Sequence, residues 1–74
     1  MAALPLLSGR EVTAIFLKLG WEIARQRGSH IILVKPGHPA TLSVPDHREV
    51  ARGTIRALLR RAGLTAEEFL AARG

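Results

Sequence analysis

Residues 21–44 read WEIARQRGSHIILVKPGHPATLSV. Three short runs in this stretch, residues 21–26, 30–35 and 40–44, carry the alternation or the β-branched residues typical of strands. Two glycine-containing turn signals separate the runs, at residues 27–29 and 36–39. Short turns between strands favour antiparallel pairing of sequential neighbours. The stretch therefore predicts a three-stranded antiparallel meander.

The first of these runs alternates imperfectly. Trp21 and Ile23 share one face of an extended chain, and the opposite face carries Glu22, Ala24 and Gln26. This run is nevertheless predicted to be a strand.

A helix is predicted over residues 9–19, before the strands. Ser8 and Glu11 have the Ser-x-x-Glu spacing of a capping box, in which each residue satisfies a free backbone N–H of the first turn. Apolar residues then recur at helical spacing, and Gly20 suits the left-handed position that ends a helix. The preceding residues 1–7 are expected to form a loose N-terminal arm.

A second helix is predicted after the strands, from about Arg52 to Ala62, with Gly63 ending it. Its apolar stripe consists of Ile55, Leu58, Leu59 and Ala62. Thr65 and Glu68 form a second capping box, which predicts a short last helix.

The predicted order of elements is α-β-β-β-α with a short C-terminal helix. Two amphipathic helices must each bury one stripe, and the economical arrangement places both on one face of the sheet. That is an α+β architecture like the double-stranded-RNA-binding domain. The 74 residues are expected to form a single domain, residues 1–74.

Composition narrows the function classes. Lys plus Arg number 11 against six acids, giving a net charge of +5, and nine of the eleven bases are arginine. Guanidinium groups suit phosphates, so nucleic acid is the leading partner class. Cysteine is absent, which excludes disulfides and thiolate metal sites and fits a cytoplasmic location. No segment approaches the roughly 20 apolar residues that a membrane span needs.

Arg52, Arg56 and Arg60 recur every four residues and form a basic ridge beside the apolar stripe of the second helix. Such a ridge can contact successive phosphates of an RNA backbone. The alternative is a solvated helix face, but acids that would neutralise the ridge from within the helix are missing. We include Lys35, at the end of the second strand, among the candidate RNA-binding residues.

Residues 25–30 read RQRGSH and gather Arg25, Arg27 and Ser29 around His30 at a tight turn. Histidine both accepts and donates protons near neutral pH. RNA cleavage without a metal needs a base for the ribose 2′-OH and an acid for the leaving 5′ oxygen, while guanidinium groups stabilise the phosphoryl charge. On residue type alone, a surface histidine at the start of a strand is the competing interpretation.

The other two histidines are given lesser roles. His38, in a Pro-Gly-His-Pro turn, is expected to be exposed to solvent and functionally silent. His47 is a candidate second proton-transfer group or a group that orients its loop. The spacing of His30, His38 and His47 matches no metal site, so no metal is expected.

Five segments resemble, in order, the landmarks of the HicA toxin family: SGREV at residues 8–12, LGW at 19–21, RGSH at 27–30, VPDH at 44–47, and RGTI at 52–55 followed by AGL at 62–64. The resemblance implies a double-stranded-RNA-binding-like fold and a toxin that cleaves mRNA. It also implies a HicB-type antitoxin that covers the active site, a catalytic role for His30, and no cofactor. One departure is Ile31, where many members carry another histidine or an aromatic residue.

Three functions remain open at this point. The first is the ribonuclease toxin, expected to be a monomer when free and a hetero-oligomer with its antitoxin. The second is a non-catalytic module that binds double-stranded RNA by shape. The third is an interaction subunit that binds an acidic partner protein.

Overall fold

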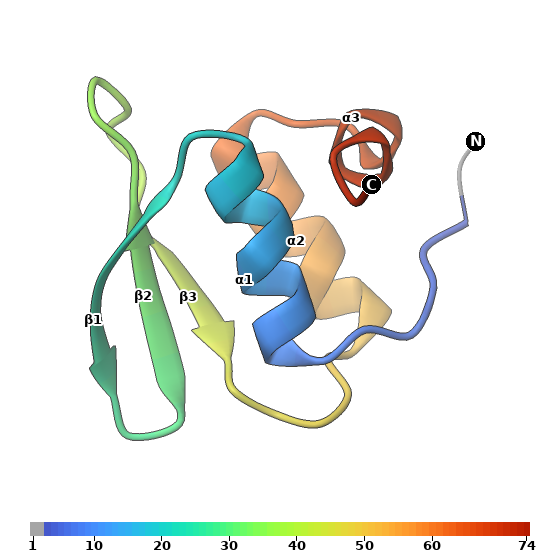
Figure 1. The fold of residues 1–74 in the computed structure, drawn as a ribbon, viewed down its shortest axis with the longest axis horizontal. Coiled ribbons are helices and arrows are strands. Elements are labelled where there is room, and N and C mark those ends of the chain that lie inside the picture. Colours follow the sequence, from blue (N-terminus) through green and yellow to red (C-terminus); the bar gives the residue numbers. More distant parts are fainter. Residues whose placement is uncertain (1–2) are drawn as a thin grey trace.

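A computed structural model describes residues 3–74 of the chain. Its elements run in the order α1 (Gly9–Lys18), β1 (Glu22–Arg27), β2 (His30–Val34), β3 (Leu42–Pro45), α2 (Arg52–Ala62) and α3 (Ala66–Ala71). The three strands form one antiparallel sheet in the order β1-β2-β3, which confirms the predicted meander. Figure 1 shows α1 and α2 together on one face of this sheet, with the short α3 beyond them. The predicted α+β fold is confirmed.

The other face of the sheet carries no helix from residues 3–74 (Figure 1). We call the face that α1 and α2 cover the helix side, and we call the opposite face the open side. None of the helices within residues 3–74 has the length and apolar character to span a membrane.

The two capping boxes form as predicted. The Ser8 hydroxyl accepts from the Glu11 amide at 3.1 Å, and a Glu11 carboxylate oxygen accepts from the Ser8 amide at 2.9 Å. Thr65 and Glu68 make the equivalent pair of bonds, at 3.1 and 2.9 Å. Gly20 has a positive φ of 95° and ends α1. Each box satisfies amide groups that the first turn of a helix leaves unpaired.

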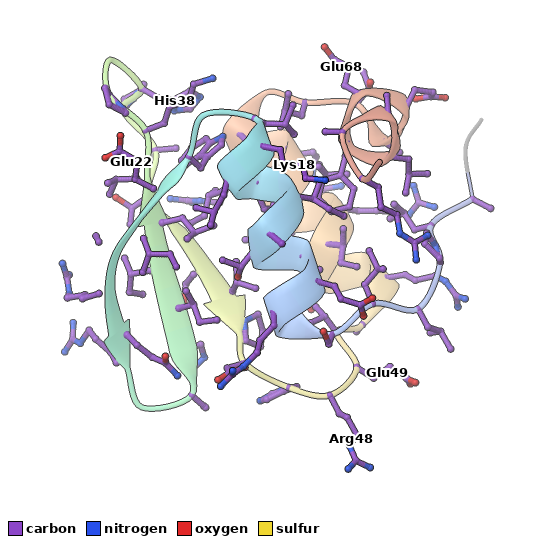
Figure 2. The ribbon with its side chains drawn as sticks, in the orientation of Figure 1. Lys18, Glu22, His38, Arg48, Glu49 and Glu68 are labelled. Carbon is purple, nitrogen blue, oxygen red and sulfur yellow. The ribbon has the colours of Figure 1, made fainter. Side chains whose placement is uncertain are left out.

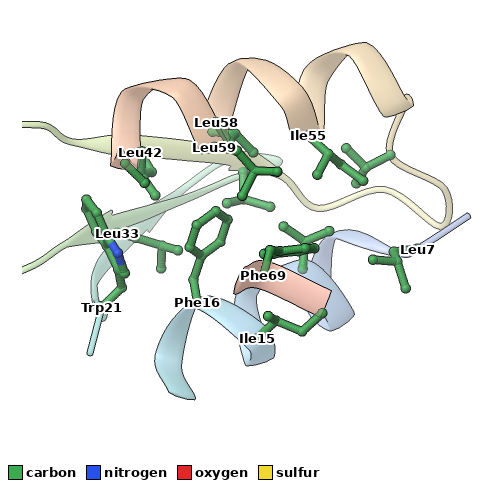
Figure 3. Packing of buried hydrophobic residues seen from close by; sticks show 14 of the residues in the cluster. Leu7, Ile15, Phe16, Trp21, Leu33, Leu42, Ile55, Leu58, Leu59 and Phe69 are labelled. Atoms are coloured by element: carbon green, nitrogen blue, oxygen red, sulfur yellow. The ribbon is translucent and has the colours of Figure 1, made fainter. Parts of the chain in front are cut away.

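The core lies between the helix side of the sheet and the three helices (Figure 3). The Phe16 ring is at its centre, with ring-centroid distances of 6.1 Å to Trp21 and 5.3 Å to Phe69. Val12, Ile15 and Phe16 of α1 are buried, and so is the predicted stripe of α2. The alternating Leu42 and Val44 of β3 are buried too. The helices thereby cover one face of the sheet only, and the open side carries charged and polar residues together with Ile32.

The predicted faces of β1 are wrong, because a β-bulge shifts the register between Ile23 and Arg25. Ile23 pairs with Leu33 and Gln26 pairs with Ile31, and both partners belong to the core, so Ile23 and Gln26 share the helix side. Trp21 is 2% exposed, but Ile23 is 53% exposed. One extra residue in a strand reverses the alternation beyond it.

The expected loose arm is also wrong for residues 3–7, while Met1 and Ala2 lie outside the described residues. Leu4 and Leu7 are buried, and Leu7 forms an isolated antiparallel bridge with Val50. The Arg52 guanidinium donates to the Leu4 carbonyl oxygen at 2.6 Å. The segment therefore packs against the start of α2.

His38 is not exposed as expected. Its ring is half-buried, 5.0 Å from the Trp21 ring between centroids. The Ala40 amide donates to its Nδ1 at 3.1 Å, so we assign the hydrogen to Nε2, which lies 3.2 Å from the Ala62 carbonyl oxygen. His38 thus joins the β2–β3 turn to the end of α2, a structural role that its turn sequence concealed.

Candidate functional site

His30 is the first residue of β2 and is exposed. It comes directly after the two-residue turn Gly28–Ser29, and it pairs across the hairpin with Arg27. Gly28 has a φ of +57°, as a two-residue hairpin turn with glycine at its first central position requires. The turn sequence itself therefore sets Arg27 directly opposite His30.

Two rows of cross-strand partners make up the open side at this end of the sheet. One row joins Arg27, His30 and Pro45, and the other joins Arg25, Ile32 and Ser43. Directly opposed residues share a face, with Cβ atoms about 5 Å apart. Arg25 and Arg27 therefore lie on the same side of the sheet as the His30 imidazole.

An open hollow of about 440 Å³ lies on this face, lined by Arg27, His30, Ile32 and Ser43. We call it the His30 hollow. No carboxylate from residues 3–74 lines it, so no acidic group in the lining offsets the positive charge of Arg27. The site combines a proton-transfer group, a cationic donor and room for a phosphodiester on one exposed surface.

The backbone of Ser29 helps to fix the position of the turn. Its carbonyl oxygen accepts from the Asp46 amide at 2.7 Å. This bond fastens the hairpin turn to the connection between β3 and α2, since Asp46 is the residue directly after β3. Ser29, the residue before His30, is therefore fixed by a hydrogen bond to Asp46, which lies 17 residues further along the chain.

Asp46 also uses its carboxylate to join two further elements. One oxygen accepts from the Gln26 side-chain amide at 3.1 Å, and the other lies 3.4 Å from Nε of Arg10 at the start of α1. We call this set of contacts the Asp46 junction. Sequence reasoning missed it, because partners 20 and 36 residues apart leave no local signal.

His47 is exposed, and its backbone anchors the same connection. Its carbonyl oxygen accepts from the Gly9 amide at 2.8 Å. Figure 2 shows the next residue, Arg48, pointing away from the protein at the end where the β1–β2 turn lies. This end of the molecule therefore presents basic side chains from two separate segments.

The remaining predicted RNA-binding residues lie apart from the His30 hollow. Arg56 and Arg60 are exposed on α2, which covers the helix side, whereas His30 faces the open side. Lys35 lies beyond the far end of β2, with its side chain against Gly20. Arg52 is bonded to Leu4. The structure brings Arg25, Arg27 and Ser29 to His30, but not these four residues.

Ile31, the departure from the family pattern, is 6% exposed and belongs to the core cluster. Its side chain points to the helix side because successive strand residues alternate. Ile31 is therefore absent from the lining of the His30 hollow.

The fold and the site define a class of small basic α+β protein, with a histidine beside arginines on an open sheet face. Residues 9–64 match the family model described as the HicA toxin of bacterial toxin–antitoxin systems. Because the match spans more than half of the 74 residues, the chain belongs to the HicA toxin family. It is accordingly a toxin of a toxin–antitoxin system, and it pairs with an antitoxin. No curated protein and no solved structure matches the chain.

Proposed function

We propose that this toxin is a metal-independent endoribonuclease that cleaves mRNA, with His30 as its general acid or base. The observation that carries the proposal is the exposed pairing of His30 with Arg27 across the hairpin, at the rim of a hollow on the open side. A proton-transfer group and a cation on one face are the two requirements of phosphodiester cleavage by the ribose 2′-OH.

In the proposed reaction, a base removes the proton from the 2′-OH, and the oxygen attacks the adjacent phosphorus. The bond to the 5′ oxygen breaks, and an acid protonates that leaving oxygen. The products are a 2′,3′-cyclic phosphate and a 5′-hydroxyl. His30 performs one of the two proton transfers, and Arg27 and Arg25 stabilise the charge on the phosphoryl oxygens. His47 is the proposed candidate for the second transfer or for orienting its loop.

Two groups of residues are proposed to bind RNA, one next to His30 and one further away. Arg25, Arg27 and Ser29 hold the nucleotides at the cleaved bond. Arg52, Arg56, Arg60 and Lys35 act on the flanking RNA backbone, which raises affinity in a salt-dependent way. The proposed partners are thus mRNA in the cytoplasm and a HicB-type antitoxin, with a free monomer that becomes a hetero-oligomer on antitoxin binding.

A cleavage assay tests the proposal. Wild type, His30→Ala and His47→Ala are incubated with single-stranded RNA in EDTA, and the products are separated on a gel. Cleavage by wild type and loss in His30→Ala, with circular dichroism and RNA affinity unchanged, is the expected result. Retained activity in His47→Ala would exclude it as the second proton-transfer group.

Full activity in His30→Ala would overturn the site assignment. Wild-type protein that binds RNA but never cuts it, with a preference for duplex over single strands, would instead favour a non-catalytic double-stranded-RNA-binding module.

A further inference from the structure

The free edge of β1 is a second surface that the proposed reaction leaves unused. The strand pairs only with β2, so its outer edge has no neighbour within residues 3–74 (Figure 1). All six of its residues are exposed. Unpaired backbone donors and acceptors along a strand are a ready template for an added strand.

An apolar groove of about 340 Å³ runs between this edge and α1. Its walls include Leu17 and Ala14 from α1, Ile23 from β1 and Ile31 from β2. Arg10 and Gln26 mark one end, where both contact Asp46. Leu17 and Ile23 are 41% and 53% exposed, and the other large exposed apolar residue within residues 3–74, Leu6, lies outside the groove. We call this surface the β1 groove.

The register of β1 dictates what an added strand must contain. Because of the bulge, Ile23 and Gln26 face the groove, while Arg25 and Arg27 face the open side. Successive residues of a strand beside β1 would likewise alternate between the two sides. One set of side chains would lie over the apolar groove, and the other set would lie beside the two arginines.

Charge selects the kind of partner. No residue that lines the groove is acidic, and the Arg10 side chain at its end is 82% exposed. A second copy of β1 carries two arginines against one glutamate, so it would add positive charge at an edge that already holds Arg25 and Arg27. Like charges on neighbouring strands are destabilising. Carboxylates on the added strand would instead pair with Arg25 and Arg27.

We propose that the β1 groove, together with the free edge of β1, binds an extended segment of an acidic partner protein in which apolar and acidic residues alternate. The segment adds a fourth strand next to β1. Its apolar residues cover Leu17 and Ile23, and its carboxylates contact Arg25 and Arg27.

One consequence rests on the proposed function. Carboxylates on Arg25 and Arg27 would compete with RNA phosphates for the same guanidinium groups, beside the His30 hollow. The partner would thus inhibit cleavage without contacting His30 itself.

The test uses two synthetic peptides and the full-length ¹⁵N-labelled toxin. In the first peptide, valine and glutamate alternate over seven residues between terminal glycines. The second has the same composition with the valines and glutamates in separate blocks. Titration is monitored by NMR, which detects millimolar affinities. The alternating peptide is expected to shift the amides of β1 and the neighbouring part of α1, and the block peptide is not.

Ile23→Ser is expected to lower the affinity of the toxin for the alternating peptide about tenfold, because one apolar contact is lost. Leu6→Ser is the matched control, because Leu6 is equally exposed but lies outside the groove, and it should bind like wild type. Equal binding of the two peptides, shifts confined to the arginines of α2, or no shifts at all would overturn the proposal. The titration contains no RNA, so its outcome is independent of whether the toxin is a ribonuclease.

Discussion

The Asp46 amide donates a 2.7 Å hydrogen bond to the carbonyl oxygen of Ser29, the residue directly before His30. The connection after β3 therefore holds the turn that presents the candidate catalytic residue. The Asp46 carboxylate, 18% exposed, extends the same hold to β1 and α1. The geometry of the turn thus depends on contacts that join β1, the connection after β3 and the start of α1.

Asp46→Ala should lower stability by about 1 kcal/mol, because the Gln26 amide and the Arg10 guanidinium lose their acceptor. It should also slow RNA cleavage, since the turn before His30 is less firmly held. Asp46→Asn keeps an acceptor for Gln26 and should stay near wild type, because the Arg10 side chain is largely exposed and such ion pairs contribute little. Urea unfolding and cleavage rates check both variants. An Asn variant as impaired as the Ala variant would show that the charge itself is required.

Gly9→Ala should destabilise the protein by about 1–3 kcal/mol, in the range of overpacked sites. A Cβ at residue 9 would collide with the Pro45 carbonyl oxygen and lie 2.9 Å from Cα of Asp46, both backbone atoms that resist movement. Gly53→Ala is the matched control, because it lies in the first turn of α2 with open space around it. Alanine there should be neutral or stabilise by about 0.5–1 kcal/mol. Denaturant midpoints that fall equally in both variants would contradict the steric argument.

The capping box of α1 predicts a pH dependence. The Ser8 backbone amide, and then its hydroxyl, hold the pKa of Glu11 below its ordinary value of 4.5. A carboxyl whose pKa is lower in the folded state stabilises the protein above its unfolded pKa and loses that contribution as the pH falls through the folded pKa. Glu11→Gln should therefore be less stable than wild type at pH 7, and the difference should shrink toward pH 3.

Thermal unfolding from pH 7 to pH 3 measures this difference. The control is Glu22→Gln, which removes the same charge from an exposed strand end. A stability gap between Glu11→Gln and wild type that does not change with pH would mean that the carboxylate contributes nothing to the cap.

His38→Ala should cost about 1–3 kcal/mol, because the Ala40 amide and the Ala62 carbonyl oxygen lose a partly buried partner. His47→Ala removes an exposed imidazole and should stay within about 0.5 kcal/mol of wild type. Chemical denaturation of the two variants side by side is the measurement. Equal stability of the two variants would show that His38 does not stabilise the fold.

Arginines near His30 should affect the cleavage rate, whereas arginines far from it should affect RNA binding. Arg27→Ala should lower the cleavage rate at saturating RNA about a hundredfold, as the loss of one charge-stabilising donor does elsewhere. Arg56→Ala should leave that rate unchanged and reduce the salt dependence of binding to single-stranded RNA by about 0.7 in the log–log slope. Cleavage rates and binding isotherms at several salt concentrations separate the two effects. A rate loss in Arg56→Ala as large as that in Arg27→Ala would refute the division.

Local patterns made much of the fold predictable. The capping boxes at Ser8 and Thr65 and the glycine that ends α1 are interactions between residues a few positions apart, so the sequence states them directly. The Gly28–Ser29 turn belongs to the same group, and it determines the position of Arg27 beside His30. The strand order was predictable because short turns join sequential neighbours.

Other features were decided only by the tertiary structure. The bulge in β1 moved Gln26 to the helix side, where it meets Asp46. Packing also buried Leu4 and placed the His38 ring against the carbonyl oxygen of Ala62, 24 residues further along the chain. Each of these results comes from a contact between distant segments, whose free energy exists only after the chain has closed on itself. Residue spacing along the chain carries no record of such contacts, whereas caps and turns are complete within a few residues.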